Sequence, residues 1–186
     1  MSKANKSNKA IKYRLYPNDE QKVMFAKTFG CCRFVYNQLL ALQKQRYKDG
    51  ESHLSKLKSN EFATRTLKKD YDFLKEIDKF AVSNAVFHLA DAYDRFFKKQ
   101  NHFPKFKSKR KSKKSYTTNF TNNNILIGKN VIKLPKVGMV KAVIHKLPKD
   151  DWKLKSVTVS QDSVGNYFAS VLFEYEQEDI PSVSKS

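Results

Sequence analysis

The sequence predicts an α+β fold in which a small antiparallel barrel is interrupted by a block of helices. Apolar residues alternate in a short segment near the start, recur every three or four positions up to about residue 100, and alternate again beyond residue 125. Alternation is typical of strands, and the longer spacing is typical of helices. Because one short strand cannot form a sheet by itself, we expect the first segment to join the later strands.

The composition is that of a folded domain. The chain has 186 residues, of which 40% are hydrophobic and 14 are phenylalanine. Such a content suffices for a packed core and argues against disorder of the whole chain. Glycine and proline number only five each, so most of the chain is expected in regular structure. The length suits one domain or two small ones.

Local signals define the first elements. Residues 1–9 are expected to form a disordered basic lead. Residues 10–17 predict the first barrel strand, since apolar side chains alternate there and Pro17 ends the segment. Asn18 and Gln21 have the spacing of a capping box, which is typical of a helix start.

Residues 18–100 are predicted to be a helical block. Gly30 is expected to separate two helices, and a weaker helix follows at about 54–67. The clearest helix begins near Asp78, and we interpret its apolar stripe as core. A helix-turn-helix interpretation of the block is an alternative, although no inserted recognition helix is evident. The stripe consists of Val82, Ala85, Val86, Leu89, Tyr93, Phe96 and Phe97.

The period changes after the helices. Residues 101–114 form a basic junction, and residues 115–178 are predicted to supply the remaining barrel strands. Segments 125–127 and 131–134 have the pattern of a hairpin. Three further alternating segments cover 139–144, 154–159 and 167–175, and residues 179–186 form a tail that loses the pattern.

Positive charge is concentrated in one part of the chain. The net charge is +19, and no acidic residue occurs between Asp94 and Asp150. A local excess of this kind is expected for a phosphate-binding face. In its densest part, residues 102–116, rings could stack on bases while cations meet phosphates. A solvated basic linker is the open alternative. We expect nucleic-acid backbone contacts from Lys105, Lys107, Lys109, Arg110, Lys111, Lys113 and Lys114.

No catalytic pattern is evident in the sequence. The four histidines lack metal-ligand spacing, and no glycine-rich loop is present that could cradle phosphates. Asp91 and Asp94 fit a solvated helix face, and the adjacent Cys31 and Cys32 fit apolar packing better than nucleophilic chemistry. Two neighbouring cysteines favour a reducing, cytoplasmic location. No apolar run approaches the ~18 residues of a membrane span, so no membrane partner is expected.

Five short motifs carry a resemblance to a known family. Taken in order, they resemble the TnpB (OrfB) proteins of small insertion-sequence transposons, from about residue 10 to about residue 178. Each motif alone is weak, but the ordered set is specific. The motifs are YRLYP at 13–17, GCCRFVYN at 30–37, FPKFKS at 103–108, FTNNN at 120–124 and LPK at 134–136.

The resemblance implies both a fold and a set of partners. The implied fold is an OB-like wedge barrel interrupted by a helical recognition lobe and followed by a RuvC-like nuclease domain. The implied partners are a guide RNA and double-stranded target DNA, in a setting of transposition and DNA recombination. Base pairing would read the target, while the protein would read a short target-adjacent motif and the backbone shape.

Four positions match family regions that face the target-adjacent duplex. Lys79, Thr121 and Asn122 carry over directly, whereas Ser83 stands where some relatives have Gln. We therefore expect a target-adjacent motif different from that of those relatives. The open alternatives are a solvated lysine at position 79 and a loop with Asx-turns for the polar run 117–124.

The family's nuclease domain is expected beyond this sequence. The chain ends at Ser186, before the catalytic carboxylates and the zinc module, so magnesium and zinc are expected only with that domain. The leading hypothesis is the nucleic-acid-binding N-terminal portion of an RNA-guided DNA endonuclease. The alternatives are a non-catalytic repressor or competitor, and one half of a split nuclease that a separate RuvC-like chain completes. Whether this chain acts as an enzyme is left open.

Overall fold

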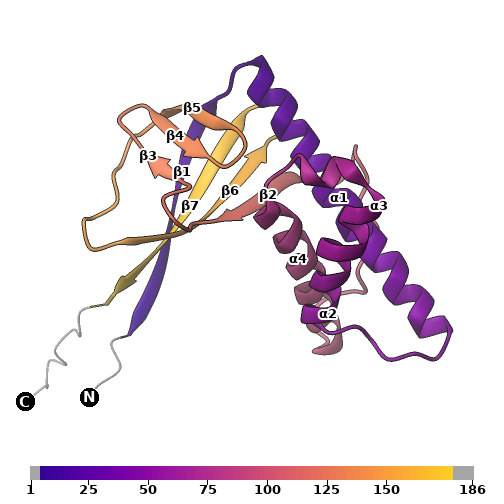
Figure 1. Ribbon diagram of the computed structural model, residues 1–186. Helices are drawn as coiled ribbons and strands as arrows, with labels where there is room; N and C mark the ends of the chain where they lie inside the picture. Colours follow the sequence, from indigo (N-terminus) through magenta and orange to yellow (C-terminus); the bar gives the residue numbers. More distant parts are fainter. Residues whose placement is uncertain (1–4, 178–186) are drawn as a thin grey trace, which may run out of the picture.

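The computed structural model describes residues 5–177, which form one antiparallel sheet and a helical block beside it (Figure 1). The predicted α+β class is confirmed. Residues 1–4 of the predicted disordered lead and the tail at 179–186 lie outside the described residues. The strands are β1 (Lys6–Tyr16), β2 (Lys114–Asn119), β3 (Leu126–Ile127), β4 (Val131–Leu134), β5 (Gly138–Val143), β6 (Lys153–Gln161) and β7 (Tyr167–Glu176).

The first strand joins the later strands, as expected, and lies in the middle of the sheet. The strand order is β2-β6-β7-β1-β5-β4-β3, and β1 pairs with β7 along most of its length and with β5 at its end. Within the described residues, the two edge strands β2 and β3 do not pair with each other, so the predicted barrel is an open sheet. At the open edge, β3 has two residues and, among the described strands, pairs with β4 alone.

Residues 6–9 belong to β1, so their assignment to the disordered lead was wrong. Lys6 lies opposite Glu176 in the sheet, and its ammonium is 3.3 Å from the carboxylate of Glu174. The Ser7 hydroxyl donates a hydrogen bond to the Gln177 side chain at 3.0 Å. The partner strand β7 supplies these bonds from the other end of the chain, which local sequence patterns cannot reveal.

The predicted helix start is confirmed, but the predicted break at Gly30 is not. Helix α1 runs uninterrupted from Asp19 to Lys48, and Asn18 and Gln21 form the expected capping box. A glycine in a helix costs only about 1 kcal/mol, and a buried stripe continues on both sides of Gly30. Packing of that stripe therefore outweighs the local preference for a break. The stripe includes Phe25, Phe29, Cys32, Val35 and Tyr36.

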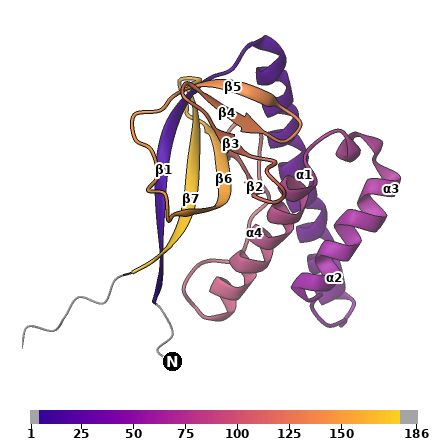
Figure 2. The ribbon, with the colours of Figure 1, turned by 60° about the vertical axis from the view of Figure 1, so that its left-hand side comes forward.

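The remaining helices follow α1 in chain order. The weak helix predicted near 54–67 is a longer irregular unit that contains a six-residue π-helix. Figure 2 shows α2 and α3 on the outer side, while α1 and α4 lie next to the sheet. The elements are α2 (Lys56–Glu61), the π-helix η1 (Phe62–Leu67), α3 (Lys68–Asp70), the 3-10 helix η2 (Asp72–Lys75) and α4 (Lys79–Phe97).

Ring contacts and hydrogen bonds join the helical block to the sheet. The Phe25 ring of α1 lies 5.5 Å from the Tyr167 ring of β7 and 6.3 Å from the Tyr116 ring of β2. The Asn84 amide of α4 donates hydrogen bonds to the Thr117 carbonyl of β2, at 2.9 Å, and to the Asn119 side chain. These contacts set the position of α4 relative to β2. The first residues of the polar run 117–124 belong to strand β2. This strand pairs with β6, and its Tyr116 and Thr118 are buried.

Candidate nucleic-acid interface

A basic groove lies where the start of α4 meets the turn after β2. The hollow measures about 500 Å³. It brings together three of the four residues predicted to face target-adjacent DNA, although they come from segments far apart in the chain. Its cationic and uncharged polar lining consists of Lys68, Lys75, Lys79, Thr121, Asn122, Asn124 and Lys136. Sequence reasoning gave no role to Lys68, Lys75 or Lys136, although Lys136 lies in one of the family motifs.

The lysines of the basic groove differ in their exposure and in their pairing with carboxylates. Lys79 is exposed at the first position of α4, and its ammonium lies 5.2 Å from the Phe80 ring. Lys75 is paired with Asp72 at 2.6 Å. Burial lowers the pKa of Lys68, and the nearby Asp78 carboxylate opposes that shift. Asp78 is the only acidic residue among the described residues that line the groove, so the surface is strongly positive.

The turn that presents Thr121 and Asn122 is held by Asn124. The Asn124 side-chain oxygen accepts from the Thr121 N–H at 2.8 Å, and its amide donates to the Asn119 carbonyl at 2.9 Å. Asn122 has a φ of +47°, which asparagine tolerates better than most residues. The Asn124 side chain thus bonds back to residues before it, whereas an Asx-turn bonds to the backbone two residues later. The side chains of Thr121 and Asn122 are exposed.

Ser83 is separated from this group. It is half-buried on α4, one turn after Lys79, and is not among the described residues that line the basic groove. The next residue, Asn84, is used to fasten α4 to β2. Lys79, Thr121 and Asn122 therefore lie together in the basic groove, whereas Ser83 lies outside its lining.

The predicted basic junction is an anchored segment. The Asn37 side chain of α1 forms a pair of hydrogen bonds with the backbone of Lys107, at 2.8 and 2.9 Å. The Lys107 ammonium lies 4.2 Å from the Tyr36 ring, and burial lowers the pKa of this lysine. Lys107 therefore holds the segment against α1 and is less available to a phosphate than its neighbours.

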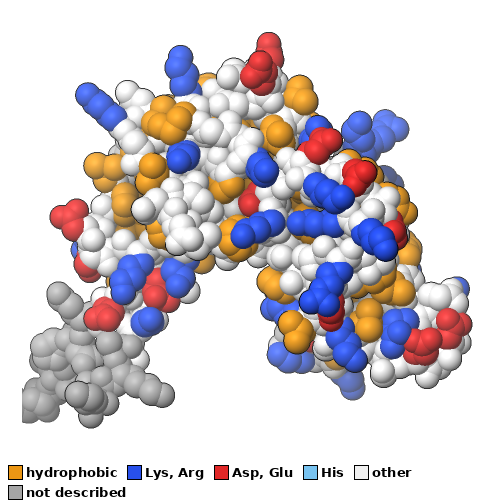
Figure 3. Space-filling view, in the orientation of Figure 1, with side chains coloured by type: hydrophobic (Ala, Val, Ile, Leu, Met, Phe, Trp, Pro, Cys, Tyr) orange, Lys and Arg blue, Asp and Glu red, His pale blue; other side chains and the backbone are white. Residues whose placement is uncertain are grey.

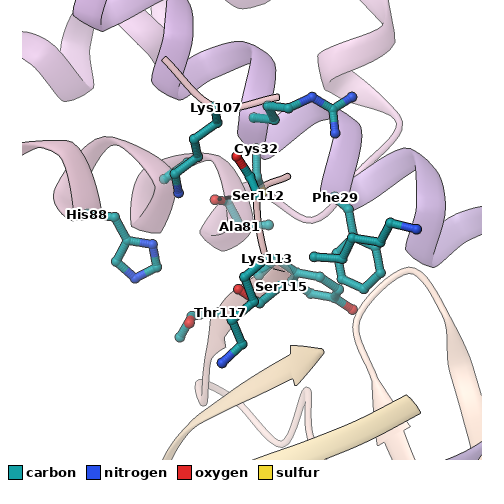
Figure 4. A pocket seen from close by; sticks show the side chains of 13 residues that line it. Phe29, Cys32, Ala81, His88, Lys107, Ser112, Lys113, Ser115 and Thr117 are labelled. Carbon is teal, nitrogen blue, oxygen red and sulfur yellow. Dashed lines mark hydrogen bonds between the residues drawn. The ribbon is translucent and has the colours of Figure 1, made fainter. Parts of the chain in front are cut away.

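A small cavity lies under the basic segment, as Figure 4 shows. Its volume of about 30 Å³ has room for roughly one water molecule. Cys32 lines this cavity, its thiol donates to the Ala81 carbonyl at 3.4 Å, and burial raises its pKa to about 12. A thiol with so high a pKa stays protonated, which supports the packing interpretation of the cysteine pair.

Two serines fold the centre of the basic segment into a tight turn. The Lys111 N–H donates to the Ser108 hydroxyl at 3.1 Å, and the Ser108 N–H donates to the Ser112 hydroxyl at 2.9 Å. The three cations within this turn project to solvent, so the segment is an ordered loop rather than a free linker. The exposed cations of the segment are Lys105, Lys109, Arg110, Lys111, Lys113 and Lys114.

The surface and composition of the described part agree with a binding role. Figure 3 shows Lys and Arg side chains gathered where the helical block meets the sheet. Among residues 5–177, no group of three or more His, Cys, Asp or Glu side chains is placed to hold a metal ion. No helix in the same range is long and apolar enough to cross a bilayer.

A family model describes one segment of the chain. The helix-turn-helix domain model of OrfB proteins from IS605 elements matches residues 5–52. In the structure, this segment contains β1 and the continuous helix α1. The geometry is therefore a strand followed by one long helix, not two helices joined by a turn.

Three relatives match larger parts of the chain. A protein of Streptomyces pristinaespiralis, named as a candidate RNA-guided DNA endonuclease, is 31% identical over 168 residues, which cover 89% of this chain and 41% of the relative. InsQ of Escherichia coli, named in the same way, is 30% identical over 174 residues, with 90% and 40% covered. The virulence protein VsdF of Salmonella dublin is 32% identical over 111 residues, with 54% and 93% covered. The chain spans about two fifths of the length of the first two relatives.

Proposed function

This chain belongs to the TnpB (OrfB) family, and from that premise we propose that it binds a guide RNA and the target-adjacent DNA duplex of an RNA-guided endonuclease. The basic groove is the single observation that carries the proposal. It assembles Lys79, Thr121 and Asn122, the positions that match the family's DNA-facing regions, into one positive hollow. A hollow of this charge and polarity suits a DNA backbone with accessible base edges.

Within the basic groove, we assign different contacts to different side chains. Lys79 and Lys136 are exposed cations that would neutralise phosphates and fix the register of the duplex. The Asn122 side chain has the donor and acceptor that pair bidentately with adenine. Asn124 already fixes the turn, so Thr121 and Asn122 would lose little conformational entropy when DNA binds.

The basic segment extends the same surface. Strand β2 begins at Lys114 in the basic segment and ends at Asn119 beside the basic groove. Its six residues span about 20 Å. That distance equals roughly six steps of a duplex at ~3.4 Å each, so one nucleic-acid helix could reach both places. We assign the backbone of the guide RNA to the cations of the 108–112 turn.

Binding measurements at several salt concentrations test this proposal. Fluorescence anisotropy with a labelled DNA duplex and with a labelled single-stranded RNA should give salt-dependent dissociation constants. If about six phosphates are neutralised, log K against log salt should have a slope near −5. The double variant Lys79→Gln/Lys136→Gln should weaken duplex binding by roughly tenfold or more. Lys153→Gln is the matched control, because Lys153 lies with Asp151 and Glu174 in another part of the molecule. A flat salt response of the unmodified chain would reject the proposal.

A second candidate is a binder that competes with an intact nuclease. It is favoured by VsdF, because 93% of that relative's length is matched by only 54% of this chain, so a relative that is shorter than this chain occurs. Adding this chain to an active family nuclease should then reduce cleavage. In the split-nuclease alternative, cleavage would instead require a separate RuvC-like chain with magnesium. Cleavage by this chain alone, with guide RNA and magnesium, would contradict both alternatives.

A further inference from the structure

A second hollow, the aromatic groove, lies between the C-terminal ends of α1 and α4. It measures about 670 Å³. Phe97, which the sequence pattern assigned to the core, is 60% exposed here, and Tyr47 is 85% exposed. The groove is lined by the rings of Tyr47, Tyr93, Phe96, Phe97 and Phe103, together with Lys44 and Lys48.

Four rings of the aromatic groove, those of Tyr93, Phe96, Phe97 and Phe103, contact one another. Tyr93 is buried, and its ring centre lies 6.0 Å from that of Phe97, with the two planes only 25° apart. Phe103 meets the Tyr93 ring edge-on at 5.5 Å and the Phe96 ring at 5.1 Å. A flat ligand entering the groove would therefore find rings already oriented, which lowers the entropic cost of binding.

Cations surround the aromatic groove. The Lys44 ammonium lies 5.6 Å from the Phe103 ring and 4.6 Å from the Phe106 ring, so it stands beside the groove's apolar wall. Lys48 is exposed on the same helix. Glu51 also lines the groove, but its carboxylate is paired with Arg46. The net charge around the rings is therefore positive, which favours an anionic ligand with flat apolar faces.

We propose that the aromatic groove binds an unpaired nucleobase of the RNA partner, with Lys44 and Lys48 on the adjacent phosphates. This inference rests on the proposed function. A base must be unstacked before its face can meet a protein ring, and RNA presents such bases in loops, bulges and ends. The target DNA of the proposed function would be bound chiefly as a duplex, whose bases stay stacked. The positive rim disfavours the alternative of an apolar protein segment, which would not need the lysines.

A fluorescent base analogue tests the aromatic groove directly. The probe is a single-stranded RNA of about 12 nucleotides, within the ~4–16 that single-strand sites span, with one central 2-aminopurine. Stacking on a ring should quench its fluorescence when the unmodified chain is added. In the double variant Tyr47→Leu/Phe97→Leu, quenching should disappear and affinity should fall by about five- to a hundredfold. Leucine keeps the apolar character of two exposed positions, so the fold and any apolar protein docking should survive.

The matched variants separate this inference from the proposed function. In Lys79→Gln/Lys136→Gln, duplex binding should weaken and the probe should still be quenched. In Tyr47→Leu/Phe97→Leu, the duplex should still bind and quenching of the probe should disappear. If the unmodified chain binds the duplex but does not quench the probe, the inference is wrong and the proposed function stands. Quenching that persists in the leucine variant would also overturn it. Equal or tighter binding of a single-stranded DNA of the same sequence would overturn the assignment to RNA. If a bound protein partner abolished RNA binding, the groove would be assigned to that protein instead.

Discussion

The two ends of helix α4 carry two different surfaces. At its N-terminal end, lysines, Thr121 and Asn122 line the basic groove, and Phe80 is the only aromatic residue among the lining residues that the structure describes. At its C-terminal end, stacked and edge-on rings line the aromatic groove. The helix has 19 residues and is therefore about 28 Å long. One helix thus separates a site suited to phosphates and base edges from a site suited to base faces.

The helix itself contributes to this difference. The N-terminus of an α-helix carries partial positive charge, which adds to the attraction of the basic groove for phosphates. The C-terminus carries partial negative charge, so the aromatic groove cannot depend on the helix for its attraction to phosphates. Stacking on rings, with cations supplied by the side chains of α1, fits that end better.

The largest expected effect comes from removing a buried contact between α1 and the sheet. Phe25 is fully buried against Tyr116 and Tyr167, so Phe25→Ala should lower the free energy of unfolding by about 3–5 kcal/mol. Urea unfolding followed by circular dichroism measures the change. Both grooves should lose binding together at denaturant concentrations where the variant unfolds. Val23→Ala is the control, because Val23 is 65% exposed on the same helix and should change stability by less than ~0.5 kcal/mol.

A smaller effect is expected at the N-terminal end of α4 only. Asn84 links α4 to Thr117 and Asn119, and Asn84→Ala should cost about 1–3 kcal/mol of stability by leaving the Thr117 carbonyl without this partner. Because the link lies near the basic groove, duplex affinity should fall while 2-aminopurine quenching at the aromatic groove persists. Equal loss at both ends, measured by the two binding assays, would mean that the two surfaces are not independent.

The basic segment should affect binding without affecting folding. The triple variant Lys109→Ser/Arg110→Ser/Lys111→Ser removes three exposed cations and leaves the anchor between Asn37 and Lys107 in place. The slope of log K against log salt should become shallower by about 2–3 for RNA. The unfolding midpoint should not move. An unchanged RNA affinity would assign the segment to a structural role.

The smallest effect is expected from acidification at the aromatic end. Burial lowers the pKa of His53, whose ring meets Tyr93 edge-on at 4.5 Å. Because the folded state then binds the proton less readily than the unfolded state, stability is complete above the unfolded pKa near ~6.5 and decreases as pH falls through that value. The ring is still partly open to solvent, so the decrease should be modest. Unfolding of His53→Gln at pH 7 and pH 5.5 should show a smaller pH dependence than the unmodified chain.

Periodicity and caps in the sequence were enough to predict the elements that depend on neighbours in the chain. The capping box at Asn18 and the helix that starts after Asp78 depend on residues a few positions apart. The strands beyond residue 125 were predicted from the alternation of their apolar residues, although β5 and β7 pair with the distant strand β1. The buried part of the α4 stripe was predicted on the same basis, whereas Phe97 was wrongly assigned to the core. Gly30 shows where local preference fails, since packing of distant residues keeps α1 continuous.

Long-range packing determines which of these elements contact one another. The sequence alone determined the α+β class, the family resemblance and the cationic segment, because each depends on composition or on residues close together in the chain. It could not place Lys68 and Lys136 beside Lys79, bury Lys107 against Tyr36, or join the ends of α1 and α4 into an aromatic groove. Those arrangements depend on how strands and helices from distant parts of the chain pack, which local periodicity does not specify.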